Sequence, residues 1–201
     1  VPGLGVLGLW AAGFFALEGG FGGTWGGYGR MQLDLLAPFD SGPWSAVLPD
    51  LPSPDHWETD HSYLGLGGLL LLAAGLAAHA WRRRPGLAAR WTLVAAALGM
   101  LSLAVSPNVS LGGRVVTLFG IPPEVLRYAD ALRASERFFW PAAYLALVGA
   151  IAALAHALGG RRTGYLLAVL ALVQVLDLQP GFARLHRYFP HDPGVAPLRL
   201  Q

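Results

Sequence analysis

The sequence predicts an all-α fold: a polytopic transmembrane helix bundle of about five spans, with long outer loops that hold short interfacial helices. The first observation is composition, because 54% of the 201 residues are hydrophobic and only 13% are charged, whereas an ordinary soluble domain carries about 25% charged residues. The second is a series of apolar segments close to the length that crosses a bilayer. The third is the uneven distribution of the fourteen basic residues, all arginines.

Five segments are predicted to span the membrane. A hydrocarbon core of about 30 Å needs about 20 mostly apolar residues in helical form. Segments that come near this length are residues 1–17, 63–81, 87–105, 138–158 and 163–179. The first begins at Val1 without a start methionine or a basic flank. We therefore expect residues 1–201 to be a single transmembrane-domain fragment whose N-terminal spans lie upstream.

The arginines predict the orientation of these spans. Residues 82–90 and 159–164 hold six arginines and no acidic residue, so the positive-inside rule places both loops in the cytoplasm. The loops 18–62 and 106–137, and a tail at 180–201, then lie outside. The sequence thus predicts a multi-pass protein of the bacterial cytoplasmic (inner) membrane, with membrane lipids as partners and no nucleic acid.

Two pieces of the outer loops are expected to lie along the membrane surface. The stretch "RMQLDLLAPF" mixes apolar and polar side chains, which suits a short surface segment. In the second loop, Pro123 followed by Glu124 is typical of a helix start. Val125, Tyr128 and Leu132 would then form the apolar face of an amphipathic helix.

The stretch "DHWETDH", residues 55–61, places carboxylates and imidazoles directly before an apolar segment. These are residue types that bind metals or act as general acids and bases. However, His56 and His61 are five residues apart, outside the i, i+4 spacing of a helical zinc pair. A polar entry segment with Asp60 or Ser62 as the helix N-cap is favoured, and no metal or cofactor is predicted. Asp177, near an outer helix end, is expected to be hydrated.

Arg133 and Arg137 precede the aromatic "FFW" that opens the fourth apolar segment. A guanidinium binds a lipid phosphate or pyrophosphate through two parallel hydrogen bonds. Arginines at this depth are equally suited to be anchors that extend their charged ends to the headgroups. The residues alone leave both interpretations open.

Three stretches together resemble a known family: "YGRMQLDLLAPFDSGPWSAVLPDLP", "YLGLGGLLLL" and "LRASERFFWPAAYL". The family is an uncharacterised domain of unknown function in bacterial multi-spanning membrane proteins, and its plan is similar to the glycosyltransferase C superfamily. Its members carry a glutamate shortly before "YLGLG", matched here by Glu58. They also carry "ASGR" before "FWP", matched by Arg137, with Glu136 in place of the usual glycine.

This resemblance implies transfer of a sugar from a polyprenyl-phosphate-linked donor at the outer face of the membrane. The catalytic acid of that superfamily usually follows the first span, upstream of this fragment. Glu58 is then a weak catalytic or orienting candidate, and Arg133 and Arg137 are candidates for binding the lipid phosphate. The alternative is a non-enzymatic membrane scaffold or polysaccharide-export component, because this stretch holds no complete catalytic constellation.

Overall fold

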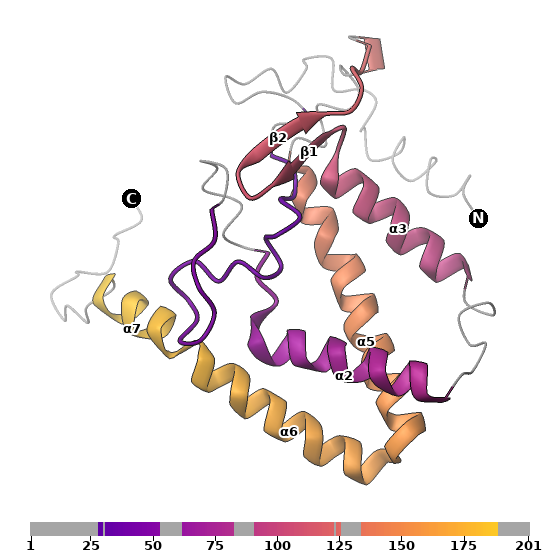
Figure 1. The fold of residues 1–201 in the computed structure, drawn as a ribbon, viewed down its shortest axis with the longest axis vertical. Coiled ribbons are helices and arrows are strands. Elements are labelled where there is room, and N and C mark those ends of the chain that lie inside the picture. Colours follow the sequence, from indigo (N-terminus) through magenta and orange to yellow (C-terminus); the bar gives the residue numbers. More distant parts are fainter. Residues whose placement is uncertain are drawn as a thin grey trace, which may run out of the picture. The chain divides into compact units, whose positions relative to one another are not determined.

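The structure, a computed structural model, describes residues 28–29, 31–52, 62–82, 91–122, 124–125 and 134–188 (Figure 1). The described chain is mostly helical, which confirms the predicted helical class. It divides into two compact units. Unit 1 takes its described residues from Val1–Leu35, Ser53–Ser62 and Arg90–Ala143, and unit 2 from Leu36–Pro52, Tyr63–Ala89 and Tyr144–Gln201.

Unit 2 is built on three apolar helices. They are α2 (Gly65–Arg82), most of α5 (Phe139–Leu158) and α6 (Gly160–Asp177), and α2 lies along α6 (Figure 1). Their shared core consists of the buried residues Leu71, Ala150, Leu154 and Leu170. Each helix shows only a narrow face to this core, so most large apolar side chains of unit 2 stay outside it.

A side chain of α6 completes the N-terminal turn of α2. The first amides of a helix have no partner within the helix. Here Gly67 N and Gly68 N donate to Gln174 Oε1, at 2.8 Å and 3.3 Å. A residue from the neighbouring helix therefore caps α2, in place of the predicted Ser62, and the other predicted cap, Asp60, lies outside the described residues.

Helix α7 (Gln179–Tyr188) follows α6 after a break at Leu178, and the two helix axes are bent by 43°. The loop of residues 36–52 contacts this corner. Ala46 N donates to Asp177 O at 2.8 Å, and the indole of Trp44 lies against the backbone of Gly181. Residues 36–52, part of the predicted first outer loop, thus form an ordered, hydrogen-bonded segment in unit 2.

Unit 1 contains α3 (Trp91–Val105), the strands β1 (Asn108–Leu111) and β2 (Arg114–Thr117), and the short 3-10 helix η5 (Ser135–Phe138). Helix α3 packs against η5, and β1 pairs antiparallel with β2 from Asn108↔Thr117 to Leu111↔Arg114. The connecting residues Gly112 and Gly113 have φ of 58° and 79°. A two-residue hairpin turn needs positive φ at both positions, which glycine adopts without a steric penalty.

The hairpin departs from the predicted all-α fold, in which the outer loops held only short helices. Residues 31–39 are also not helical: they form an extended piece followed by turns. In this segment the polar Gln32 and Asp34 are buried and Phe39 is exposed. Residues 31–39, which were predicted to be a short piece at the membrane surface, therefore form no interfacial helix. The second one, near Pro123, lies almost wholly outside the described residues.

Helix lengths test the predicted spans in part. Among the described residues, Ser135–Leu158 is the one 24-residue stretch long and apolar enough to cross a membrane. The bent pair Gly160–Asp177 and Gln179–Arg187 would be a second if it forms one span, and Gly65–Trp81 and Trp91–Val105 are shorter apolar helices. The segment 1–17 lies outside the described residues. A bundle of five spans thus stays a prediction.

A close contact between α2 and α5 predicts a position that is sensitive to substitution. A Cβ added at Gly75 would overlap Ala150, whereas one at Gly149 would meet nothing within 4 Å. We expect Gly75→Ala to lower the free energy of unfolding by about 1–3 kcal/mol, the usual cost of overpacking. Gly149→Ala, on α5, is the matched control and should leave it equal or slightly higher. Thermal unfolding of the detergent-solubilised protein measures both, and equal melting temperatures would contradict the contact.

Candidate functional site

The sequence-predicted site residues are only partly within the described chain. Glu58 and Arg133, with the rest of "DHWETDH", lie outside it. Arg137 is described: it is exposed and belongs to η5, directly before α5. The described candidate site consists of Arg137 and the buried polar side chains of unit 1 around η5.

One of these side chains is Asp34, which is 1% exposed. Its Oδ2 accepts hydrogen bonds from Ser110 Oγ at 2.6 Å and from Gly113 N at 3.2 Å. Its Oδ1 accepts one from Gly112 N at 3.1 Å. A buried carboxylate is costly unless donors surround it. Here both oxygens receive donors from the β1–β2 hairpin, so the carboxylate holds the hairpin turn.

The backbone on either side of Asp34 is bonded to several elements of unit 1. Leu33 N donates to Ala104 O at 2.8 Å, and Leu35 N donates to Ser110 O at 2.9 Å. Met31 O accepts from Glu136 N at 3.1 Å and from Ser135 Oγ at 2.9 Å. Residues 31–35 thus connect α3, the hairpin and η5.

Glu136 is a second buried carboxylate, 5% exposed. Its Oε1 accepts a hydrogen bond of 2.5 Å from Ser62 Oγ, and Ser62 itself is fully buried. Ser62 is therefore a partner of Glu136 and does not cap α2. Glu136 is not among the described residues with positive φ, so this position does not require the glycine that is usual in the resembling family.

These side chains form what we call the loop cluster: Asp34, Ser62, Ser110, Ser135 and Glu136. All five are buried, and all five come from segments predicted to be outer loops. Their carboxylates accept hydrogen bonds from serine hydroxyls and backbone amides, and these hydrogen bonds stabilise the fold of unit 1. Arg137 is different, since its side chain is exposed where the cluster ends and the apolar helix begins.

Asp177 in unit 2 repeats the pattern of a buried, hydrogen-bonded carboxylate. It is 2% exposed, so the expectation that it is hydrated is wrong. Ser45 Oγ donates to Oδ1 at 2.5 Å, and Tyr63 Oη donates to Oδ2 at 2.8 Å. The hydroxyls come from the 36–52 loop and from the segment before α2. They replace the water that would otherwise solvate the end of α6.

Metal chemistry has no support in the described part of the chain. No group of three histidine, cysteine or acidic side chains lies close enough there to hold an ion. His156 is exposed and its Nδ1 lies 2.7 Å from Ala152 O, within the same helix. The histidines of "DHWETDH" are outside the described residues, so that stretch is untested.

Comparison with protein families supplies the classification. A family model described as Domain of unknown function (DUF6311) matches residues 1–179. The chain belongs to this family. Neither the curated proteins nor the solved structures give a match. The DUF6311 match includes Arg137 and the loop cluster, and it ends at the first residue of α7.

Sequence reasoning missed most of the loop cluster, and one signal could have found part of it. "NVSL" and "RVVT" flank a Gly-Gly pair, a pattern that favours a two-residue hairpin. The burial of Asp34 by that hairpin had no comparable signal, because its partner Ser110 is 76 residues away. The structure, and not the sequence pattern, therefore identifies Asp34 and Ser110 as hydrogen-bonding partners.

The Asp34 carboxylate predicts a specific loss of stability. In Asp34→Asn, one carboxylate oxygen is replaced by an NH₂ group, which faces donors in either orientation of the amide. We expect the free energy of unfolding to fall by about 1–3 kcal/mol, the cost of unsatisfied buried donors.

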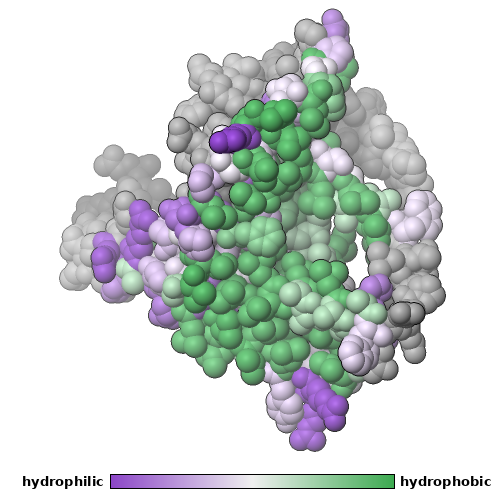
Figure 2. Space-filling model, viewed as in Figure 1, coloured by the Kyte–Doolittle hydropathy of each residue, from purple (hydrophilic) through white to green (hydrophobic). Residues whose placement is uncertain are grey.

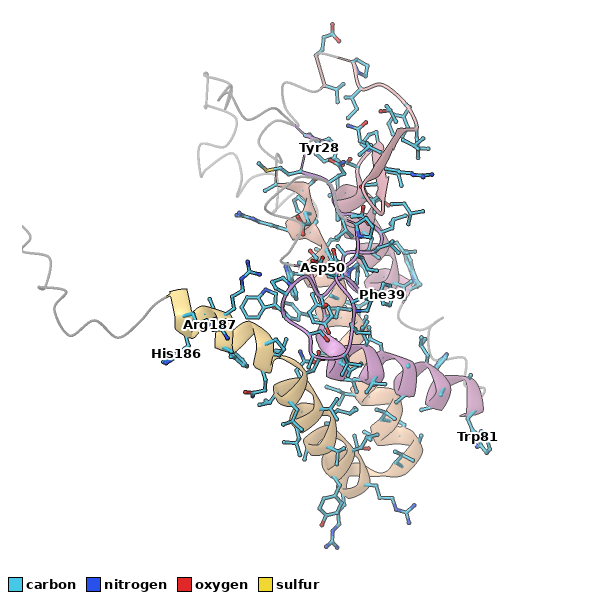
Figure 3. All side chains as sticks on the ribbon, turned by 60° about the vertical axis from the view of Figure 1, so that its left-hand side comes forward. Tyr28, Phe39, Asp50, Trp81, His186 and Arg187 are labelled. Carbon is cyan, nitrogen blue, oxygen red and sulfur yellow. The ribbon has the colours of Figure 1, made fainter. Side chains whose placement is uncertain are left out.

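The exposed Asp50, in the 36–52 loop of unit 2 and labelled in Figure 3, offers the same chemical change at a residue outside the loop cluster. Asp50→Asn should leave stability unchanged. Thermal unfolding of both variants in detergent is the measurement. An Asp34→Asn variant as stable as Asp50→Asn would show that the carboxylate does not hold the hairpin.

Proposed function

We propose that this chain is a multi-pass inner-membrane protein that acts as a glycosyltransferase with a polyprenyl-phosphate-linked sugar donor at the outer face of the membrane. The observation that carries the proposal is the position of Arg137. It is exposed near the start of the 24-residue apolar stretch Ser135–Leu158, directly after the buried Ser135 and Glu136 of the loop cluster. At about 1.5 Å per residue such a stretch exceeds a hydrocarbon core of about 30 Å, so Arg137 would lie at headgroup level.

The helix surfaces support the membrane part of the proposal. Only 28% of the most apolar window of Ser135–Leu158 is buried, whereas the core helix of a soluble protein is mostly buried. Hydrophobic residues cover much of the coloured surface in Figure 2. Large exposed side chains on α5 and α6 include Val148, Val169, Leu172 and Leu176. Exposed apolar area of this extent requires an apolar partner, and the bilayer supplies one.

Charge within unit 2 supports the predicted orientation. Arg161 and Arg162 are exposed at the turn between α5 and α6. The guanidinium of Arg161 lies 5.9 Å from the ring centre of Tyr165, a pairing that suits a membrane interface. The opposite end of α6 carries Asp177 and the 36–52 loop. Arginines at one helix end and an acid at the other agree with a cytoplasmic 159–164 turn.

The proposed chemistry gives Arg137 the lipid phosphate or pyrophosphate. A guanidinium can donate two parallel hydrogen bonds to phosphate oxygens and stabilise the charge that develops as the sugar leaves. Arg133 is the second candidate for this role, and Glu58 is proposed to orient a substrate or loop.

A specific observation favours the alternative, a non-enzymatic scaffold or polysaccharide-export component. The carboxylates of Asp34, Glu136 and Asp177 are all buried and hydrogen-bonded to serine or tyrosine hydroxyls. None of the three is placed as an accessible general base. If Arg137 has no effect on sugar transfer, the scaffold is the better description of this region.

The proposed topology predicts opposite labelling at two exposed positions. The chain contains no cysteine, so Val116→Cys and Gly160→Cys each introduce a single thiol. Val116 is 60% exposed in β2, and a side chain at Gly160 would meet nothing within 4 Å. In intact cells a membrane-impermeant maleimide should label position 116, whereas position 160 should react only after permeabilisation. Equal labelling in intact cells would contradict the topology.

The proposed chemistry predicts loss of activity without loss of folding. Removing a hydrogen-bonded charge costs about 1.5–3 kcal/mol, which corresponds to a rate reduction of about tenfold to a hundredfold. We expect this reduction in sugar transfer by the full-length protein for Arg137→Ala, partial recovery for Arg137→Lys, and a reduction for Glu58→Gln. Arg114→Ala changes another exposed outer-loop arginine and is the control. Unchanged surface glycan assembly in the Arg137→Ala and Glu58→Gln variants would overturn the proposed glycosyltransferase activity.

A further inference from the structure

Helix α7 has two chemically different faces that the proposed function does not use. It is far more strongly amphipathic than α2, α3, α5 or α6. Phe182 and Leu185, three residues apart on one face, are 48% and 40% exposed. Arg184 and Arg187 fall on the opposite side of the helix by the 3.6-residue repeat, and Figure 3 marks Arg187 near the end of α7.

Another part of the α7 surface, at Gly181, packs against the 36–52 loop. A Cβ added at Gly181 would overlap the indole of Trp44, so the 36–52 loop lies directly on the helix backbone there. Phe182 N donates to Leu178 O at 3.1 Å across the bend. This contact fixes the rotation of α7 about its axis while leaving the Phe182–Leu185 face exposed.

The surroundings of α7 indicate what covers that face. The helix follows the apolar α6 after a 43° bend, and so turns away from the direction of the proposed span at its outer end. It contains two arginines and no acidic residue, which complements anionic lipid headgroups. An amphipathic helix with arginines on one face and Phe or Leu on the other is the type that lies in a membrane interface.

We propose that α7 lies in the headgroup region of the outer leaflet, with Phe182 and Leu185 inserted among the acyl chains and Arg184 and Arg187 bound to lipid phosphates. This inference rests on the membrane location proposed above. It goes beyond the family, because the family match ends at residue 179. In this position α7 and Trp44 hold the outer end of α6, with its buried Asp177, at a fixed depth.

The test uses the full-length protein with single cysteines at α7 positions. Leu185→Cys and Arg184→Cys are each labelled with an environment-sensitive fluorophore and reconstituted into vesicles that contain lipids with a quencher on the upper part of the acyl chains. We expect loss of emission at position 185 and little change at position 184. Protection of position 185 from the quencher, as by a covering protein segment, would overturn the inference.

A third label separates this inference from the membrane proposal itself. Leu172 is 59% exposed in the apolar part of α6, so Leu172→Cys should be quenched by lipids that carry the quencher deep in the acyl chains. Quenching at position 172 without quenching at position 185 would overturn only the proposed interfacial position of α7. Quenching at neither position would overturn the proposed membrane location of the protein.

The lipid composition tests the role of the arginines. Quenching at position 185 should be greater in vesicles containing phosphatidylglycerol than in phosphatidylcholine alone, and Arg184→Gln with Arg187→Gln should remove the difference. Equal quenching in the two lipid mixtures without these substitutions would overturn the assignment of the arginines to anionic headgroups.

Discussion

The arrangement of the loops in unit 1 depends on the hydrogen bonds made by residues 31–35. The Asp34 carboxylate accepts three donors from the hairpin, and the neighbouring backbone is bonded to α3, β1 and η5. These elements are short: each strand has four residues and η5 has four. A two-stranded hairpin is marginal by itself in water. The hydrogen bonds of the buried Asp34 carboxylate stabilise the hairpin. The same segment, through Met31 O, binds η5, which contains Arg137, so the position of Arg137 depends indirectly on residues 31–35.

The distribution of burial is the reverse of that in a typical soluble domain. The largest fully buried side chains among the described residues are Asp34, Ser41, Ser62, Ser110 and Ser135, whereas many Leu, Val and Phe side chains are exposed. Small apolar residues such as Ala104 and Ala150 fill the helix contacts. Lipid chains solvate large apolar side chains as well as a protein core does, and close helix contacts in membranes favour small residues. The proposed membrane location therefore explains both halves of the pattern.

The sequence predicted the apolar helices but did not predict α7 or the arrangement of the loops. Residues 179–188 form α7, although most of them were predicted to be an outer tail. Helix α6 begins at Gly160, three residues before the predicted start of its span, whereas residues 87–90, the predicted start of the third span, lie outside the described residues. The hairpin had a local signal in its Gly-Gly turn. Burial of Asp177 and Glu136 had none, because their hydroxyl partners lie 132, 114 and 74 residues away in the chain. Such pairs depend on how the chain folds back, which hydrophobic periodicity does not encode.

The backbone next to Arg137 supports the proposed phosphate-binding role of this residue. An anchor that extends to the headgroups needs only a long flexible side chain, and any residue at the start of a span could supply it. Arg137 instead belongs to η5, where the preceding residue is fixed twice: Glu136 N donates to Met31 O, and Glu136 Oε1 accepts from Ser62 Oγ. Holding a binding group on a rigid backbone lowers the entropy lost when a ligand binds. These buried hydrogen bonds make the backbone next to Arg137 rigid. A rigid backbone helps a residue that binds a phosphate, whereas an interfacial anchor would gain nothing from it.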